Sequence, residues 1–276
     1  MISQELEKKY HHLQNIISSW HSLGVAFSGG VDSAFLLYVA HDILKEKAIA
    51  ITVVSPVLPE WERQDAEAFC KEHGIVHEAV SLDLTGFRDF ALNPANRCYH
   101  CKRLFMGQII ERCRLLGCDK LAEGSNIDDL KDYRPGLKAV EELQIVSPLQ
   151  EAGLSKQEIR MLAHHLGLSI WEKPSSACLA SRIPYGEEIT REKLARIQSA
   201  EKFLHELGFH QIRVRARQKE ARIELEEAEI NRLMEPELRR QIHDGLKNMG
   251  FTYVSMDLGG FCSGNMKQEI FVTANS

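Results

Sequence analysis

The sequence lacks a long apolar run. None of its hydrophobic stretches approaches the roughly 18 residues that a membrane-spanning helix needs. The first residues, MISQELEKKYHH, are polar and have no apolar core, so they do not resemble a secretory signal. These absences predict a protein without a membrane partner, and we expect it in the cytoplasm.

An excess of basic residues and a disulfide framework are missing as well. The formal net charge is −5, whereas proteins that bind nucleic-acid backbones usually carry an excess of Lys and Arg. Seven cysteines are an odd number in a chain of 276 residues and do not indicate a disulfide scaffold. We therefore expect reduced thiols and no nucleic-acid partner.

The first part of the chain alternates between strand-like apolar runs and helical patterns. The run Ala48–Val54 is rich in Ile, Val and Thr without polar alternation, which is typical of a strand covered on both faces of a parallel sheet. The pattern predicts a doubly wound parallel α/β sheet. The other expected strands are 23–27, 75–82, 120–124 and 169–172, and the expected helices include 3–20, 59–73, 102–116 and 155–166.

The pattern changes after Tyr185-Gly186, where a compact α+β unit is expected. Its predicted elements are a helix at 191–207, two alternating strands at 211–217 and 220–226, a helix at 236–248 and a strand at 252–258. This order resembles a small ferredoxin-like module. We predict two domains, 1–182 and 183–276.

A glycine-serine loop, Ser28-Gly29-Gly30-Val31-Asp32-Ser33, joins the first expected strand to a helix. Glycines let the backbone approach an anion, and the free amides of the helix N-terminus favour phosphate. The loop has no Gly-Lys-Ser/Thr ending, so it is not the P-loop that holds β- and γ-phosphates beside a lysine. It resembles the pyrophosphate loop of the N-type ATP pyrophosphatases, in which Asp32 would help to hold Mg²⁺. A plain strand-to-helix turn is the alternative interpretation.

Three cysteines stand in positions that suggest chemistry. Cys98 and Cys101 form a CxxC pair at the start of a helix, and Cys178 follows a Pro-Ser-Ser loop. The spacing suits an iron–sulfur cluster, half of a zinc site or incidental thiols about equally well, and a redox dithiol is a further alternative for the pair. Cys262 is a candidate fourth thiol, whereas Cys70, Cys113 and Cys118 are interpreted as packing residues.

Four segments together resemble the LarE family of ATP-dependent sulfur transferases, which mature the nickel-pincer nucleotide cofactor of lactate racemase. The resemblance covers nearly the whole chain and rests on segments 26–33, 132–139, 181–186 and 257–261. It implies that ATP adenylates a carboxylate of pyridinium-3,5-biscarboxylic acid mononucleotide with release of pyrophosphate, and that sulfur then displaces AMP. It also implies a homo-oligomer.

The resemblance implies one of two sulfur sources. Members with a CxxC and a third cysteine hold a [4Fe–4S] cluster whose open iron carries a sulfide, and Cys98, Cys101 and Cys178 match that pattern. Other members sacrifice a single cysteine. Ala177 occupies the aligned position of that residue, so the cluster is the favoured interpretation and a sacrificial Cys178 the alternative.

The remaining site residues follow from matching positions. Arg213 and Arg215 alternate on one strand, so both face the same side, where guanidinium groups suit a phosphate. Beside Cys178, the expected catalytic residues are Lys102, Ser181, Arg182 and Glu201, and Glu224 is a second expected Mg²⁺ ligand. The expected nucleotide-binding positions are Ala26, Phe27, Ser28, Gly29, Gly30, Val31, Asp32, Ser33, Val53, Gly124, Asn126, Arg134, Arg213 and Arg215.

Three rival functions fit part of the pattern. A tRNA thiolase pairs such a loop with a CxxC, but the acidic net charge opposes it. An amide-forming NAD or GMP synthetase leaves the three thiols unused. A zinc-stapled protein that binds adenine nucleotides without catalysis is the alternative outside the enzymes.

Overall fold

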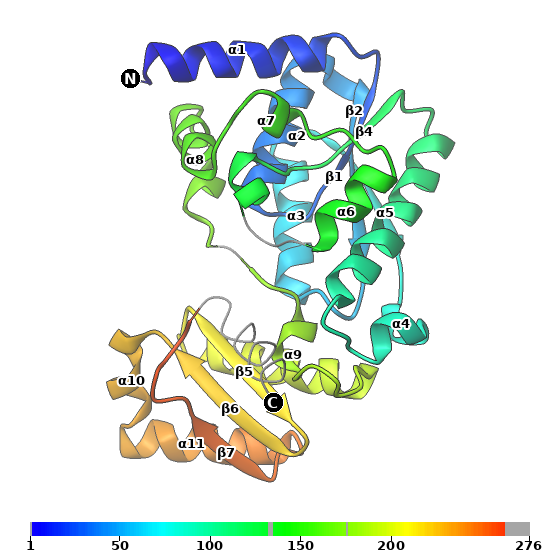
Figure 1. Ribbon diagram of the computed structural model, residues 1–276. Helices are drawn as coiled ribbons and strands as arrows, with labels where there is room; N and C mark the ends of the chain where they lie inside the picture. Colours follow the sequence, from blue (N-terminus) through cyan, green and yellow to red (C-terminus); the bar gives the residue numbers. More distant parts are fainter. Residues whose placement is uncertain (1, 132–134, 175, 263–276) are drawn as a thin grey trace. The chain divides into compact units, whose positions relative to one another are not determined.

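A computed structural model describes residues 2–131, 135–174 and 176–262 (Figure 1). The chain divides into two compact units. Unit 1 comprises residues 1–83 and 98–176, and unit 2 comprises residues 84–97 and 177–276. The excursion 84–97 into the second unit is a feature that hydrophobic patterning does not indicate. The expected domain boundary after residue 182 stays a prediction.

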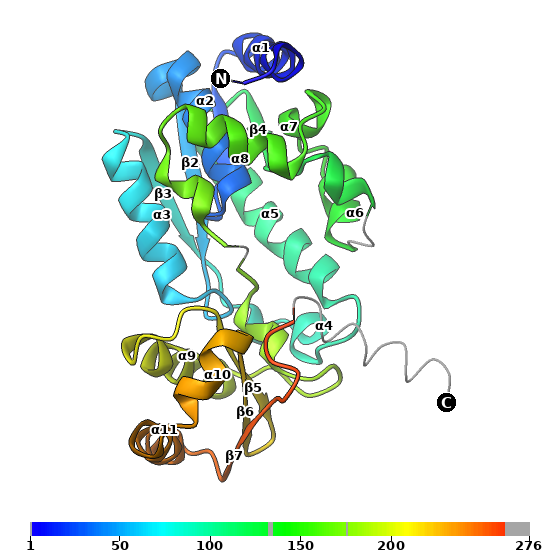
Figure 2. The ribbon, with the colours of Figure 1, turned by 90° about the vertical axis from the view of Figure 1, so that its left-hand side faces the viewer.

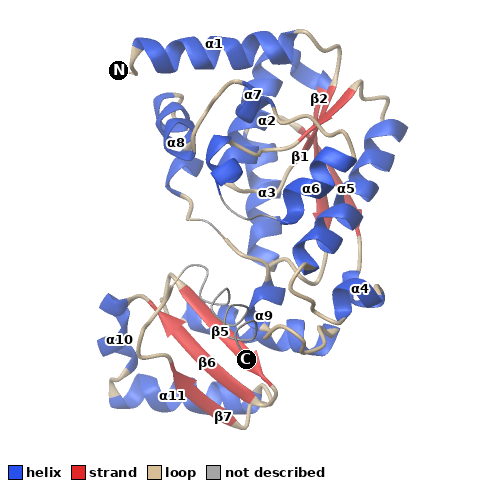
Figure 3. Cartoon of the chain, viewed as in Figure 1, coloured by secondary structure: helices blue, strands red, loops and turns tan. Residues whose placement is uncertain are grey.

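Unit 1 contains a four-stranded parallel sheet of order β3-β2-β1-β4 (Figures 1 and 3). Its strands are β1 Leu23–Ala26, β2 Ala48–Val54, β3 Val76–Ser81 and β4 Lys120–Ala122. Its helices are α1 Gln4–Ser18, α2 Val31–Leu44, η1 Lys45–Lys47, α3 Glu60–Glu72, α5 Arg97–Leu115 (Arg97 itself belonging to unit 2), η3 Ile127–Lys131, α6 Pro135–Glu142, α7 Pro148–Glu151, α8 Lys156–His165 and η4 Ser169–Glu172.

Both faces of this sheet are covered, as the apolar runs predict. Successive residues of β2 point to opposite faces: Ala48 and Ala50 pack with α1, α2, α3 and α8, whereas Ile51 and Val53 pack with α5. The helices lie on either side of the strands in the turned view (Figure 2). This confirms the doubly wound parallel fold.

Unit 2 is the expected α+β unit. Its three-stranded sheet has the order β5-β6-β7, with β5 and β6 antiparallel and β7 parallel to β6. Its strands are β5 Ile212–Arg217, β6 Glu220–Leu225 and β7 Tyr253–Met256. Its helices are η2 Leu84–Gly86, α4 Arg88–Ala91, η5 Leu179–Arg182, α9 Arg191–Glu206, α10 Glu227–Leu233 and α11 Pro236–Asn248.

One predicted strand is wrong. Residues Ser169–Glu172 form the 3₁₀ turn η4, in which Lys173 N–H donates to Ile170 O at 3.1 Å. Ile170 and Trp171 pack against the core beside α8, so the apolar residues that suggested a strand are used in a turn. Instead, Val146 forms a single parallel bridge with Ala122 at the edge of β4. A run of four residues is too short for periodicity to distinguish a strand from a turn.

None of the described helices is long and apolar enough to cross a membrane.

Candidate functional site

The loop between β1 and α2 is held in shape by its own serines. Ser28 N–H donates to Ser33 Oγ at 3.3 Å, and the two hydroxyls are 3.1 Å apart. Ser33 Oγ donates to Gly30 O at 3.1 Å. Gly29 has φ +75°, and a Cβ there would lie 3.2 Å from Glu62 O. Gly30 is the N-cap of α2 without a side-chain cap, which leaves the first amides of the helix to bind an anion.

The strand β4 closes on this loop through a glycine. A Cβ on Gly124 would lie 2.9 Å from Ser33 N and 3.1 Å from Ser33 Cα. Only glycine therefore lets the end of β4 meet the start of α2. This close approach places Gly124 beside the loop, as expected for a nucleotide site at the carboxyl edge of a parallel sheet.

Asp32 forms an ion pair that sequence reasoning missed. Lys156 Nζ donates to Asp32 Oδ2 from the first residue of α8. The other oxygen, Asp32 Oδ1, is buried and has no hydrogen-bond partner among the described residues. Burial raises the pKa of Asp32, against the opposing charge of Lys156. An orphaned carboxylate oxygen at an anion-binding loop is the donor type that Mg²⁺ prefers.

A turn after β4 brings Lys156 to its place. Asn126 Oδ1 accepts from Asp128 N–H at 2.9 Å, and Asp128 Oδ2 accepts from Lys156 N–H at 2.9 Å. Asn126 is buried at 2% exposure, so its side chain supports the turn. Ser155 and Glu158 form a capping box that begins α8. The capping box is a sequence signal that identifies the start of this helix, but it does not identify the partner of Lys156.

The buried carboxylate of Glu123 lies beside Lys102. Lys102 Nζ donates to Glu123 Oε2 at 3.1 Å, while Ser125 N–H and Ser147 Oγ donate to Oε1 at 3.0 and 2.8 Å. Burial alone would raise the pKa of Glu123, but the charge of Lys102 and the bonds from Ser125 and Ser147 hold it below its usual value. Glu123 was absent from the expected site because a lone glutamate at a strand end has no distinctive spacing.

Of three other expected nucleotide positions, two belong to the core and one lies outside the residues that the structure describes. The ring of Phe27 packs against that of Phe69, with 5.7 Å between the ring centres. The Phe27 carbonyl accepts a hydrogen bond from Thr52 Oγ1 at 2.9 Å. Val53 is 5% exposed and packs on the α5 side of the sheet. Arg134 lies outside the described residues.

The CxxC pair occupies the beginning of α5 in unit 1. Cys98 is exposed and Cys101 is half-buried, and residues three apart on a helix lie on one face. Gly136 packs against this turn, because a Cβ there would lie 3.5 Å from Lys102 Cβ and 3.8 Å from Cys98 O. The helix N-terminus favours thiolates over thiols.

Cys178 belongs to unit 2, where it is the N-cap of η5. Its carbonyl accepts from Ser181 Oγ at 2.7 Å and from Arg182 Nη1 at 3.2 Å. Within the described parts of the chain, no group of three or more His, Cys, Asp or Glu is gathered as a metal site.

Unit 2 contains a buried cluster of charges on one face of β5 and β6. Arg182 donates to both oxygens of Glu201, at 2.8 and 3.0 Å, and Arg215 donates to both oxygens of Glu224, at 2.9 and 2.8 Å. Arg215 also donates to Ser181 O at 2.6 Å. All four side chains are at most 7% exposed. Such bidentate pairs satisfy both charges without water.

Arg213 is the unbalanced cation of this cluster. It donates to Cys262 O at 3.4 Å, and its guanidinium lies 4.5 Å from the centre of the Phe261 ring. No carboxylate of the described chain forms an ion pair with it. Burial and the neighbouring charges of Arg182 and Arg215 lower its pKa to about 10, so it stays protonated at neutral pH. Among the buried members of this cluster, three guanidinium groups face two carboxylates, so the sum of their charges is positive.

Glu224 does not have the environment of a magnesium ligand. It is fully buried, both oxygens accept from Arg215, and Arg222 Nη2 lies 3.5 Å from Oε1. Arg232, in the helix after β6, donates to Gly208 O at 2.8 Å and covers the Phe209 ring. Arginine side chains therefore surround Glu224. A Mg²⁺ ion bound to Glu224 would need further carboxylates there instead.

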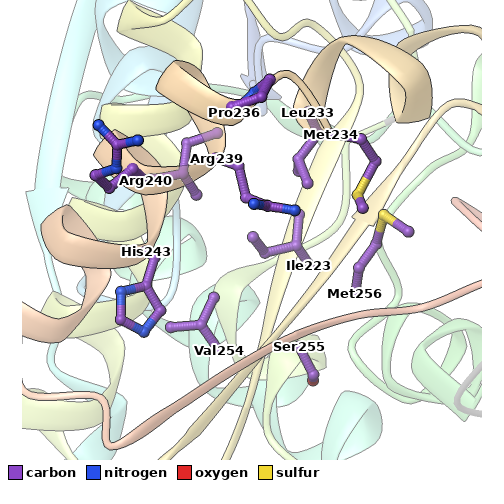
Figure 4. A pocket seen from close by; sticks show the side chains of 11 residues that line it. Ile223, Leu233, Met234, Pro236, Arg239, Arg240, His243, Val254, Ser255 and Met256 are labelled. Carbon is purple, nitrogen blue, oxygen red and sulfur yellow. The ribbon is translucent and has the colours of Figure 1, made fainter.

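A shallow groove of about 400 Å³ also occurs in unit 2 (Figure 4). Ile223, Met234, Val254 and Met256 line it, and Arg239 lies among them. Ile223 precedes Glu224 on β6, so the groove and the charge cluster lie on opposite faces of the sheet. None of the expected site residues lines this groove.

Comparison with known proteins defines the class of this chain. Residues 5–95 match the family described as NAD synthase. The loop, the parallel sheet and this match define an ATP pyrophosphatase domain. The chain is 36% identical over 247 residues to the pyridinium-3,5-bisthiocarboxylic acid mononucleotide synthase of Lactiplantibacillus plantarum, covering 89% of each chain. It belongs to that LarE family of sulfurtransferases.

Two other relatives frame this assignment. An uncharacterized protein of Synechocystis, slr1717, is 41% identical over 96% of this chain and 99% of its own length. A tRNA-cytidine(32) 2-sulfurtransferase of Syntrophotalea carbinolica is 29% identical over 42% of this chain and 46% of its own length. The alignment with the Lactiplantibacillus plantarum synthase covers 89% of this chain and so extends into both units.

Gly124→Ala tests the close approach of β4 to the phosphate loop. The added methyl group must displace Ser33, so we expect the rate of ATP consumption at limiting ATP to fall about tenfold to a hundredfold. Gly107→Ala is the matched control, because no atom beyond the adjacent turns of its own helix lies within 4 Å of its added Cβ. Equal activity in the two variants would contradict the predicted contact.

Arg182→Met and Arg213→Met separate paired from unpaired charge in unit 2. Removing Arg182 leaves Glu201 buried without its partner, and we expect a loss of about 3–5 kcal/mol in the free energy of unfolding. Removing Arg213 relieves repulsion among cations, so its cost in urea unfolding should be much smaller. A similar loss in both variants would show that Arg213 is structurally paired.

Proposed function

We propose that the chain adenylates a carboxylate of pyridinium-3,5-biscarboxylic acid mononucleotide and then replaces the activated oxygen with sulfur. A carboxylate oxygen attacks the α-phosphorus of ATP, the bond to the bridging oxygen breaks, and pyrophosphate leaves. A sulfur nucleophile then attacks the carboxyl carbon, and AMP leaves with the oxygen. The observation that carries the proposal is the preformed phosphate loop closed by Gly124, in a chain with a LarE relative across 89% of its length.

The phosphate loop supports the activation step. Its amides and the N-terminus of α2 would bind the pyrophosphate portion of ATP, and the serine hydroxyls fix the loop before binding. Lys156 would neutralise phosphate charge by exchanging its bond to Asp32 for one to ATP. The orphaned Asp32 Oδ1 fits a Mg²⁺ ion, which when bound would offset the charge of the leaving pyrophosphate.

The buried cluster of charges in unit 2, with Arg213 as its unpaired member, would bind the phosphate of the mononucleotide. Arg213 and Arg215 project from the same face of β5, and Arg213 has no carboxylate to neutralise it within the described residues. A phosphate dianion would compensate this buried positive charge. Ser181 and Glu201 would act as positioning residues, since Ser181 O fixes Arg215 and Glu201 fixes Arg182.

Cys98, Cys101 and Cys178 would hold a [4Fe–4S] cluster. The pair at the start of α5 supplies two thiol groups on one helix face, where the helix dipole stabilises thiolates, and this donor set fits the cluster. When bound through three cysteines, the cluster would supply a sulfide at its open iron. Lys102, one residue after Cys101, would supply a positive charge on the same helix turn.

Cys178→Ser tests the division of the reaction into two halves. With ATP, Mg²⁺ and the dicarboxylate nucleotide, the variant should release pyrophosphate but form no thiocarboxylate, which mass spectrometry of the nucleotide measures. Arg213→Met serves as the matched variant and should instead raise the KM for the nucleotide. If the wild-type protein released no pyrophosphate with this substrate, the proposal would be wrong, and release with tRNA would favour the thiolase.

Iron analysis after anaerobic reconstitution tests the sulfur source. We expect about four iron atoms and four sulfides per chain, a number that follows from cluster type, and loss of the absorbance of the cluster in Cys98→Ser. Cys70→Ser is the control, because Cys70 is buried in unit 1 away from the CxxC turn. A protein that holds zinc alone, or one whose Cys178 loses H₂S during turnover, would overturn the cluster.

A further inference from the structure

Cys113 and Cys118 stand at the two ends of a helix-terminating motif. Gly117 has φ +71°, Cys118 N–H donates to Cys113 O at 3.0 Å, and Gly117 N–H donates to Arg114 O at 3.1 Å. These are the two bonds of a Schellman motif, in which the side chains of the first and last residues meet. A hydrophobic pair is common at these positions, and here both are cysteines.

The two sulfurs converge on a single point of β1. A Cβ on Gly24 would lie 2.8 Å from Cys113 Sγ and 3.5 Å from Cys118 Sγ. The thiol of Cys113 donates to Lys120 O at 3.5 Å, at the start of β4. Gly24 therefore provides room for both sulfurs, and the motif keeps them on the same side of β1.

We propose that Cys113 and Cys118 form an oxidisable dithiol that reacts with low-molecular-weight disulfides such as glutathione disulfide. The Cys118 thiolate attacks one sulfur of the external disulfide, and the other sulfur leaves as a thiol. Cys113 then loses its proton to solvent and attacks Cys118 Sγ, which breaks the mixed disulfide and releases the second thiol. Two protein thiols are oxidised, and one external disulfide is reduced to two thiols. This chemistry is independent of the sulfur-transfer reaction.

Exposure and acidity assign the order of the two cysteines. Cys118 is half-buried, whereas Cys113 is 4% exposed. The neighbouring thiol of Cys113 lowers the pKa of Cys118, and the proximity of Cys118 together with burial raises the pKa of Cys113. A lower pKa makes Cys118 the attacking thiol, and its capture removes the negative charge that opposed ionisation of Cys113.

The closed form would join the end of α5 to the residues that lead into β4. A disulfide across so short a segment removes few conformations from the unfolded chain, so a modest rise in Tm is expected. The bond does not touch the phosphate loop or the CxxC turn.

Peptide mass spectrometry tests the dithiol directly. The reduced protein is treated with glutathione disulfide, alkylated, and cleaved after glutamate, which yields the peptide 112–123 with both cysteines. We expect this peptide to be two hydrogens lighter, without an adduct or alkylation, and the Tm to rise until a reductant is added. Cys70 is the internal negative control, because burial raises its pKa to about 12.

Two serine variants distinguish the proposed order of attack. Cys113→Ser should accumulate a stable glutathione adduct on Cys118, whereas Cys118→Ser should leave the buried Cys113 unmodified. Their circular dichroism spectra establish that both variants are folded. A wild-type peptide that keeps two alkylated thiols while Cys98 reacts, or one that carries a lasting adduct on Cys118, overturns the proposal.

Discussion

The ion pair between Asp32 and Lys156 is the interaction around which the candidate site of unit 1 is arranged. It connects the phosphate loop after β1 to the first residue of α8. The turn at Asn126–Asp128, which follows β4, in turn holds the backbone of Lys156. Three segments that are far apart in the sequence are therefore connected through Lys156. Burial raises the pKa of Asp32, and its Oδ1 is buried without a hydrogen-bond partner among the described residues.

Both units solve the problem of buried charge, but in different ways. In unit 1, the two site carboxylates have one cation each: Asp32 has Lys156 and Glu123 has Lys102. In unit 2, Arg182 and Arg215 are paired by bidentate bonds, while Arg213 adds a further positive charge. Burying an unpaired charge costs stability unless a ligand compensates it. Arg213 instead contacts the Cys262 carbonyl and the Phe261 ring.

Much of the fold and part of the candidate site could be predicted from residue order. Apolar runs without alternation indicated the parallel sheet, and glycines before a helix indicated the phosphate loop, because both are local patterns. The partners Lys156 and Glu123 could not be predicted, since they follow from the packing of α8 and β4 rather than from spacing. The apolar residues of Ser169–Glu172 suggested a strand. In the structure these residues form a turn that packs against α8, and a run of four residues does not distinguish the two.

The sequence by itself determined the doubly wound class, the phosphate loop, the three chemically suggestive cysteines and the LarE resemblance, because each rests on residue type and local order. Only the tertiary structure decided which charges are paired. It placed Gly124 against Ser33, and it gave both oxygens of Glu224 to Arg215. It also brought Cys113 and Cys118, which local order suggested were mere packing residues, together beside Gly24. Side-chain contacts of this kind depend on how the elements pack, which residue order alone does not specify.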